Sequence, residues 1–367
     1  MKLNTNLNYV DMDGLEDLVE RLSKVRPLEP GETEESRFKK QEIEKQINEV
    51  IDKIGINLDA EQRQAVHHIG TPLVIIACPG SGKTTTTKIK EIVLEKVHGV
   101  SADKILSVTY STAAAKDMKK KHREFASKVG LESRIEIRTL HSLFLSILLK
   151  HSTAAGYYGK INILEENDRE RMLTSICAEV LRTTNRSTVR AVNTLISYVV
   201  NNMLTSKAEI MNTQAFIESR ISWESYEAII TKYEDRKLQK NYLDFDDLQI
   251  KALELLQNND LVRKEVQSYW THYIVDEFQD VSKLQLEILK LIVVHPNNLT
   301  VIGDDDQTIY EWRGSCGDII LDFPLLYSNT KKIILRTNYR CPEIISSAAL
   351  KSIRYNKKRA DKEMIAP

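Results

Sequence analysis

One stretch constrains the fold more than any other. Residues 73–87 read LVIIACPGSGKTTTT, a short apolar and β-branched run followed by a glycine-rich loop and a helix-forming segment. The backbone N–H groups of such a loop, together with the helix N-terminus, form a cradle for phosphate groups. Lys83 would reach the terminal phosphates, and the Thr84 hydroxyl would bind Mg²⁺. The stretch therefore predicts an α/β nucleotide-binding domain of the P-loop type, although Ala77 stands where this motif usually has its first glycine.

Five other apolar runs resemble the strand that precedes this loop. They are ILSVT (105–109), IEIR (135–138), YIV (273–275), LTVI (299–302) and IILR (333–336). Several are followed by segments with helical spacing, which is typical of a parallel sheet whose crossover helices lie on both faces. We therefore expect one parallel sheet as the body of the molecule.

Two parts of the chain fall outside this pattern. Well over a hundred residues separate the third and fourth apolar runs, and they carry helical stripes such as Leu173, Ile176 and Cys177. We interpret residues 149–241 as a helical subdomain inserted into the sheet domain. Residues 1–56 form a charged, helical N-terminal extension, which either packs on the body or binds a protein partner.

A second chemical motif, VDEFQD, follows the fourth run. Carboxylates at the C-terminal edge of a parallel sheet lie where ligands bind. Asp276 suits Mg²⁺, and Glu277 suits a base that orients the attacking water. An isolated acidic pair of this kind is usually a solvated loop. Together with the phosphate loop, it indicates nucleotide hydrolysis.

Composition limits the alternatives. The 367 residues give room for two or three domains, and 52 basic residues balance 52 acidic ones, so net charge neither favours nor excludes a nucleic-acid partner. The four cysteines have no metal-ligand spacing and are expected to be reduced thiols. The sequence has no apolar run of membrane-spanning length and no signal-peptide pattern at its start. We expect a cytoplasmic protein without a membrane partner.

The order of the motifs resembles a known family. LDAEQRQAV, GSGKT, VDEFQD, GDDDQTIYEWRG and NYR, in this order, are similar to the UvrD/Rep/PcrA group of superfamily-one DNA helicases. The resemblance runs from about Leu58 to the C-terminus and weakens in the insertion. It implies a RecA-like ATP-binding lobe in two parts, residues 57–148 and 242–335, followed by the start of a connection to a second lobe in residues 336–367. ATP, Mg²⁺ and single-stranded DNA, or a single/double-strand junction, are the implied ligands.

The resemblance also implies roles on the nucleotide side. Gln62 would hydrogen-bond the adenine edge, and Tyr339 would stack on the base. Gln307 would sense the γ-phosphate or the attacking water, and Arg340 would touch the γ-phosphate. The implied catalytic set is Lys83, Asp276, Glu277, Gln307 and Arg340, and the remaining ATP-binding residues are Pro79, Gly80, Ser81, Gly82, Thr84 and Thr85. Thr85 stands where the group often has an arginine against the base, which implies a lower base affinity.

The implied DNA contacts are Tyr110, His141, Tyr310, Trp312 and Arg313. Trp312 and Arg313 suit base stacking and a phosphate or cation–π contact, whereas core packing is the alternative for Tyr310 and Trp312. In the Tyr110 motif, residues 112 and 113 are Thr and Ala in place of the group's Asn and Lys, so one phosphate contact is in doubt. The basic run at 116–128 is either a solvated helix face or a second backbone contact.

Two functions stay open at this point. One is the ATP- and DNA-binding half of a helicase or translocase; the other is a nucleotide-switched module that grips DNA or protein without unwinding. Motifs of a second lobe do not occur before Pro367, and a reading frame continuing past that residue would discriminate the two. For residues 1–367 alone we expect ATP binding without duplex unwinding.

Overall fold

The computed structural model describes residues 33–158, 161–308, 318–353, 355 and 359–365. Tyr310, Trp312 and Arg313, three of the predicted DNA contacts, lie outside the described residues. The chain divides into two units, residues 1–49 and 50–367. In the first unit, the described part is almost entirely helix α2 (Glu34–Ile54), which continues into the second unit. Within residues 1–56, for which helix was expected, the described part is therefore helical over Glu34–Ile54.

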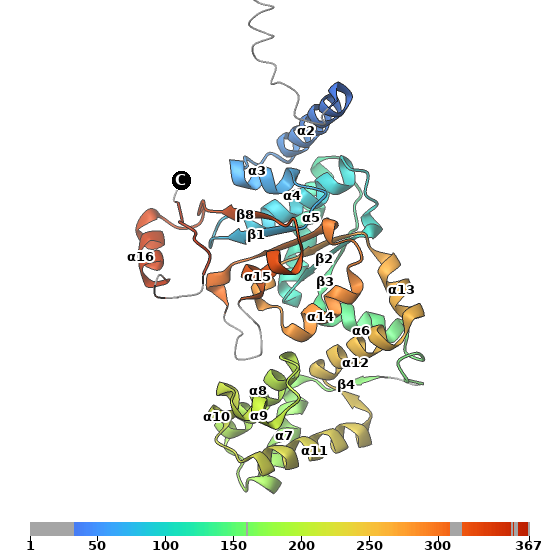
Figure 1. The fold of residues 1–367 in the computed structure, drawn as a ribbon, viewed down its shortest axis with the longest axis vertical. Helices are drawn as coiled ribbons and strands as arrows, with labels where there is room; N and C mark the ends of the chain where they lie inside the picture. The colour runs from blue at the N-terminus through green and yellow to red at the C-terminus, as the bar shows by residue number, and fades with distance from the viewer. Residues whose placement is uncertain (1–32, 159–160, 309–317, 354, 356–358, 366–367) are drawn as a thin grey trace, which may run out of the picture. The chain divides into compact units, whose positions relative to one another are not determined.

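The second unit is built on a parallel sheet, as predicted (Figure 1). Its six strands occur in the order β3-β2-β6-β7-β1-β8, and every pair of neighbours is parallel. All six predicted runs form these strands, with ends shifted by at most two residues. The strands are β1 (Leu73–Ala77), β2 (Ile105–Thr109), β3 (Glu136–Thr139), β6 (His272–Val275), β7 (Leu299–Gly303) and β8 (Lys331–Leu335).

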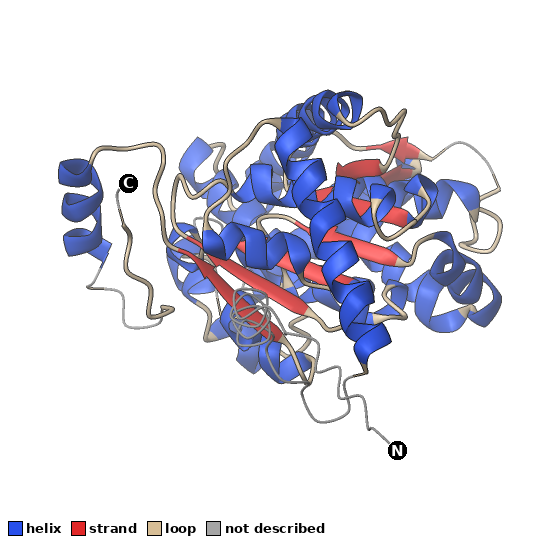
Figure 2. Ribbon diagram, turned by 90° about the horizontal axis from the view of Figure 1, so that it is seen from above, coloured by secondary structure: helices blue, strands red, loops and turns tan. Residues whose placement is uncertain are grey.

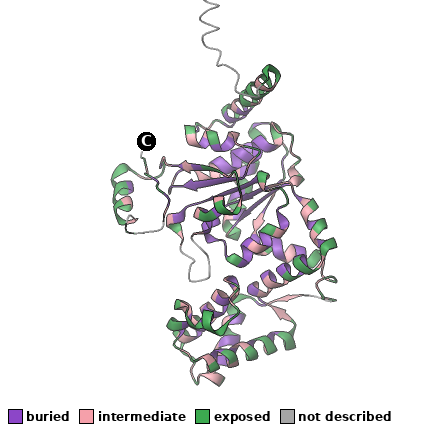
Figure 3. Ribbon diagram, in the orientation of Figure 1, coloured by how far each residue is buried: buried purple, intermediate pink, exposed green. Residues whose placement is uncertain are grey.

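Helices flank the sheet on both faces (Figure 2). Every residue of β1 is at most 1% exposed, because helices cover both faces of this parallel sheet and leave its inner strands no side toward solvent. Figure 3 shows the same strands as buried. The helices of this sheet domain are α3 (Ala60–His67), α4 (Lys83–Lys96), α5 (Thr112–Lys128), α6 (Leu140–Lys150), α12 (Phe245–Asn258), α13 (Asp260–Tyr269), α14 (Lys283–Ile292) and α15 (Ile319–Leu326), and α16 (Glu343–Ile353) follows the last strand.

Between α6 and α12, where an inserted subdomain is expected, the chain forms a further group of helices. Its helices surround their own apolar cluster, which includes Leu173, Ile176 and Cys177 from the predicted stripe. It differs from the expectation in two respects. The boundary at 148/149 falls inside the last turn of α6, and the insertion is not wholly helical, because strand β4 (Asn162–Ile163) pairs in parallel with β5 (Tyr242–Leu243). The helices are α7 (Glu166–Val180), α8 (Arg186–Asn201), α9 (Lys207–Met211), α10 (Gln214–Ser219) and α11 (Trp223–Lys240).

The C-terminal residues return to the sheet domain. After α16, the chain runs back beside the end of β8, where Thr337 and Ile365 form a parallel bridge. Asn338 N donates to Ile365 O (2.7 Å) and Ile365 N donates to Arg336 O (3.0 Å). Among the described residues, no helix is long and apolar enough to cross a bilayer.

Candidate functional site

The glycine-rich loop connects the buried strand β1 to helix α4, as the sequence predicts. Gly82 occupies the N-cap position with φ of +79°, and no side chain in the described part of the chain caps the helix there. The first-turn N–H groups are thereby left to a ligand, and the helix dipole favours an anion at this end. Lys83 and Thr84 begin α4 at the same point. The loop therefore has the local geometry of a phosphate cradle.

Two glycines of the loop are needed because other segments approach it closely. A Cβ on Gly80 would lie 2.4 Å from Asn338 Oδ1 and 2.7 Å from Arg340 Cβ. A Cβ on Gly82 would lie 2.7 Å from Gln62 Nε2. Both glycines also have positive φ, which disfavours any other residue. Three motifs that are far apart in the sequence thus meet at one loop.

Side chains next to the loop are held by several hydrogen bonds. Gln62 Nε2 donates to Ser81 O (2.9 Å), while Gln62 Oε1 accepts from Asp59 N (3.1 Å) in a capping box that starts α3. Tyr339 N donates to Gly80 O (3.0 Å) and its hydroxyl donates to Asp59 Oδ2 (2.9 Å). The half-exposed Tyr339 and the buried Gln62 therefore share a hydrogen-bond partner, Asp59, next to the loop. Each polar end of the Gln62 amide already has a protein partner, which the sequence did not indicate.

The acidic motif follows β6, two strands away from β1 in the sheet. Asp276 is buried, and no group among the described residues hydrogen-bonds its Oδ1 atom. Burial, with the charge of Glu277, raises the pKa of Asp276 to about 6 despite the opposing effect of Lys83. Burial and Glu277 likewise raise the pKa of Asp280 to about 7. A divalent cation would favour the ionised form of Asp276, so this buried carboxylate fits a Mg²⁺ ligand.

Lys83 and Glu277 bring the two motifs together. Lys83 Nζ lies 3.4 Å from Glu277 Oε2. Glu277 itself has φ of +52°, a sparsely populated conformation for a residue with a side chain. The predicted phosphate lysine and the predicted base therefore share one site at the C-terminal edge of the sheet.

Comparison with known proteins identifies the family of this chain. The model of the UvrD/REP helicase N-terminal domain matches residues 58–327. The chain belongs to the UvrD/REP helicase family. Relatives include the "Probable DNA helicase II homolog" of Mycoplasma capricolum, 33% identical, where the match covers 86% of this chain and 43% of that protein.

Two further relatives of this UvrD/REP domain are named more specifically. The ATP-dependent DNA helicase PcrA of Staphylococcus epidermidis is 32% identical over 83% of this chain and 41% of its own length. The ATP-dependent DNA helicase Rep of Buchnera aphidicola is 29% identical over 82% of this chain and 45% of its own length. The chain spans less than half the length of each of these relatives.

A second candidate surface in the UvrD/REP domain lies where the sheet meets the insertion. A cavity of about 410 Å³ is lined by Tyr110 and His141, two of the predicted DNA contacts, and by Phe245. Tyr110 follows β2 and His141 follows β3, which are neighbours in the sheet. The His141 and Phe245 rings pack edge to face with centroids 5.7 Å apart. The cavity thus joins two motifs of the sheet domain to the segment that returns from the insertion.

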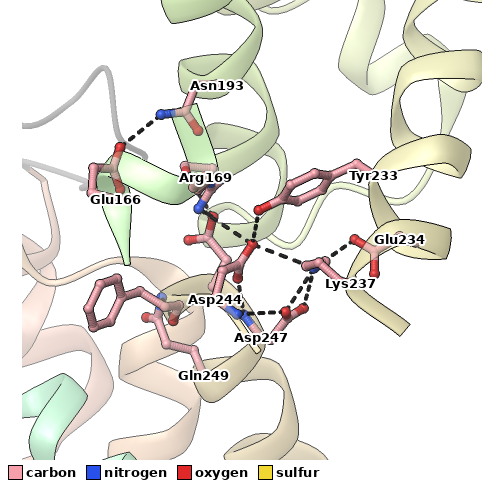
Figure 4. A network of polar contacts seen from close by, with 12 residues as sticks. Glu166, Arg169, Asn193, Tyr233, Glu234, Lys237, Asp244, Asp247 and Gln249 are labelled. Carbon is pink, nitrogen blue, oxygen red and sulfur yellow. Dashed lines mark hydrogen bonds and ion pairs between the residues drawn. The ribbon is translucent and has the colours of Figure 1, made fainter. Parts of the chain in front are cut away.

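A buried ionic network fixes that returning segment (Figure 4). Arg169 Nη1 of α7 lies 2.7 Å from Asp246 Oδ2 and 3.6 Å from Asp244 Oδ2. Lys237 Nζ of α11 lies 2.8 Å from Asp247 Oδ1 and 3.5 Å from Asp244 Oδ2. Burial raises the pKa of Asp244, but Arg169 and Lys237 outweigh it and hold that pKa below its usual range. These acidic residues lie in LDFDDL (243–248), and nothing in that stretch indicates its partners on α7 and α11.

The basic residues on α5 do not all face solvent. Lys116, Lys119 and Lys120 are exposed, whereas Lys121 Nζ donates to Thr85 Oγ1 (2.6 Å) in the first turn of α4. The Lys121 ammonium therefore lies next to Thr85, the position at which the helicase group often has an arginine. Its signal in the sequence was hidden inside a run of five lysines and one arginine.

Among the remaining predicted nucleotide residues, Gln307 and Arg340 are both exposed. Gln307 Nε2 donates to Asp304 Oδ2 (2.7 Å) after β7, the strand between β6 and β1. Arg340 N donates to Asn338 Oδ1 (2.8 Å), so the backbone of NYR is held in a turn beside Gly80. Pro79, Ser81 and Thr85 lie in or next to the loop as expected.

Proposed function

We propose that this domain binds Mg²⁺-ATP at the β1–α4 loop and is the first ATP-binding lobe of a DNA helicase or translocase. The observation that carries the proposal is the 3.4 Å approach of Lys83 Nζ to Glu277 Oε2 beside an uncapped helix N-terminus. A triphosphate entering the loop competes with Glu277 for Lys83. Glu277 is then released to accept a proton from the attacking water.

The carboxylates supply the metal-binding side of the proposed site. Thr84 and Asp276 would hold Mg²⁺, directly or through water. When bound, the ion neutralises charge that develops on the phosphate oxygens. The unpartnered Asp276 Oδ1 atom supports this assignment, because a buried carboxylate oxygen is normally satisfied.

Single-stranded DNA is the proposed second ligand. The cavity beside Tyr110 and His141 carries aromatic groups on which a base can stack. Trp312 and Arg313, which lie outside the described residues and follow Gln307 closely in the sequence, are further proposed DNA contacts. A base–aromatic stack needs no sequence-specific hydrogen bonds, which suits a protein that moves along DNA.

Calorimetry with Mg²⁺-ATP on residues 1–367 and on Lys83→Ala tests the nucleotide site. We expect binding by the parent chain and none by the variant, with unchanged circular dichroism because Lys83 lies at the sheet edge. Equal affinity in a folded variant would refute the assignment. Hydrolysis by residues 1–367 is expected to stay near background, because these residues contain no second-lobe motif that could supply an arginine finger, and the lack of that group lowers phosphoryl transfer by about 10³–10⁵. Robust DNA-stimulated hydrolysis or strand separation would instead mean that the site is completed in another way.

A further inference from the structure

The three consecutive aspartates after β7 are occupied by cations from the far end of the chain. Lys362 Nζ contacts the carboxylates of Asp304 and Asp305 and lies 3.1 Å from Asp306 Oδ2. Its side chain is 1% exposed. A lysine is almost never buried this deeply unless it is paired. The contact is therefore specific and not a loose surface ion pair.

Arg359 completes this cluster from the same segment. Its Nε and Nη2 atoms donate to the two oxygens of Asp306, at 3.0 and 2.8 Å. This bidentate pairing is the strongest geometry available to an arginine and a carboxylate. Ala360 N also donates to Asp305 Oδ2 (2.6 Å). We call the contacts of residues 359–362 with Asp304, Asp305 and Asp306 the aspartate clasp.

The clasp explains why carboxylates can cluster at this place. Ligand oxygens of the three aspartates all lie within 4.8 Å of one another, an arrangement that could hold a metal ion. Here the Lys362 ammonium makes the contacts with these carboxylates that a metal ion would make. Burial raises the pKa of Asp306, but Arg359 and Lys362 outweigh it and keep that pKa below its usual range.

A short path of hydrogen bonds leads from the clasp to the proposed catalytic residues. Asp304 N donates to Gln279 Oε1 (3.0 Å), and Gln279 Nε2 donates to Glu277 Oε2 (2.9 Å). Asp304 Oδ2 also accepts from Gln307 Nε2 (2.7 Å). Gly303 leaves room for the Gln279 side chain, because a Cβ at that position would lie 2.2 Å from Gln279 Oε1.

We propose that Lys362 and Arg359 are positioning residues that hold Asp304, and through it Gln279, Glu277 and Gln307, in place for the bound nucleotide. The clasp then couples nucleotide occupancy to the chain segment that follows α16. This inference rests on the proposed function of the Lys83–Glu277 site. Coupling must act in both directions, so nucleotide binding also tightens the clasp.

The test uses residues 1–367 with Mg²⁺-ATPγS as the probe. Calorimetry gives the dissociation constant, and hydrogen exchange with mass spectrometry follows peptides that cover residues 299–308 and 359–365. The main variant is Lys362→Met combined with Asp305→Asn, in which one carboxyl charge is removed with the lysine so that the fold is kept. Lys362→Arg tests rescue by another cation. Lys351→Met, an exposed lysine on α16, is the matched control.

In the parent chain and in Lys351→Met, the nucleotide should slow exchange in both peptides. In the double variant, affinity should fall at least about fivefold, the lower end of typical coupling, and the slowing at 359–365 should be lost. Lys362→Arg should restore part of both effects. Unchanged affinity and unchanged slowing in a folded double variant would overturn the proposal and leave the clasp a purely structural contact. Absence of binding to the parent chain would instead overturn the nucleotide site, and the coupling with it.

Discussion

Replacing Lys90 with methionine should stabilise this protein at neutral pH. Lys90 lies on α4, and its ammonium is buried within the sheet domain. Its Nζ atom donates to the carbonyl oxygens of Ala65 (3.1 Å) and His68 at the end of α3. Within the described ranges, no carboxylate forms an ion pair with it. Burial therefore lowers the pKa of Lys90 from 10.5 to about 7.

That pKa sets the size and the sign of the effect. The difference between 10.5 and about 7 is about 3.5, which corresponds to a ceiling of about 5 kcal/mol for charging Lys90 in the folded state. Two carbonyl groups left without a donor cost about 1 kcal/mol each, so Lys90→Met should gain about 3 kcal/mol at pH 7. Between pH 7 and 10.5 the unfolded chain holds a proton that the folded chain lacks. Stability of the parent protein therefore rises with pH in this window, by at most about 1.4 kcal/mol per pH unit.

Urea unfolding at pH 7, 8 and 9, followed by tryptophan fluorescence and circular dichroism, measures this difference. The advantage of Lys90→Met should be largest at pH 7 and should shrink with each step upward. Lys96→Met, an exposed lysine at the end of the same helix, should change stability little at every pH. The reasoning is refuted if Lys90→Met is less stable at pH 7, or if its advantage does not depend on pH.

Three other substitutions probe the site and its support. Glu277→Gln should retain Mg²⁺-ATP binding by calorimetry but lose turnover where a second lobe completes the site, because the amide cannot accept the proton; near-normal turnover would reassign the base. Arg169→Met should lower the free energy of unfolding by about 3–5 kcal/mol in urea, because it leaves buried Asp246 without its cation, and adding Asp246→Asn should recover part of that loss. Trp312→Ala should weaken binding of a labelled single-stranded oligonucleotide by about 1–3 kcal/mol in fluorescence anisotropy with little change in ATP affinity. Unchanged binding with lost thermal stability would make Trp312 a core residue.

The features that the sequence predicted depend on contacts between near neighbours in the chain. The strands were recognisable because runs such as residues 73–77 are continuous and β-branched, as a fully buried parallel strand must be. The phosphate loop was recognisable because its glycines, lysine and threonine are adjacent. The placement of Asp276 and Glu277 followed from the rule that parallel strands end at one sheet edge.

The features that the sequence did not predict depend on pairs that are distant along the chain. Arg359 and Asp306 are 53 residues apart, and Arg169 and Asp246 are 77 apart. Without the fold, each of these charged residues reads as an ordinary solvated side chain. The Gln62 amide illustrates a different limit. Both ends of this amide contact the protein, which the sequence could not show. Its role in adenine binding is still a prediction.

The short β4–β5 pair bears on how this domain could be re-engineered or could have diverged. The chain leaves for the insertion and returns from it on paired strands, so α7–α11 form a cassette whose two ends are adjacent, as tolerated insertions require. However, α7–α11 also form buried ion pairs with residues outside the cassette. It carries Arg169 and Lys237, whereas Asp246 and Asp247, which pair with them, belong to the segment that returns to the sheet domain. A variant in which α7–α11 are exchanged or deleted must therefore also have the aspartates of residues 244–247 changed. Otherwise these carboxylates stay buried without their cations.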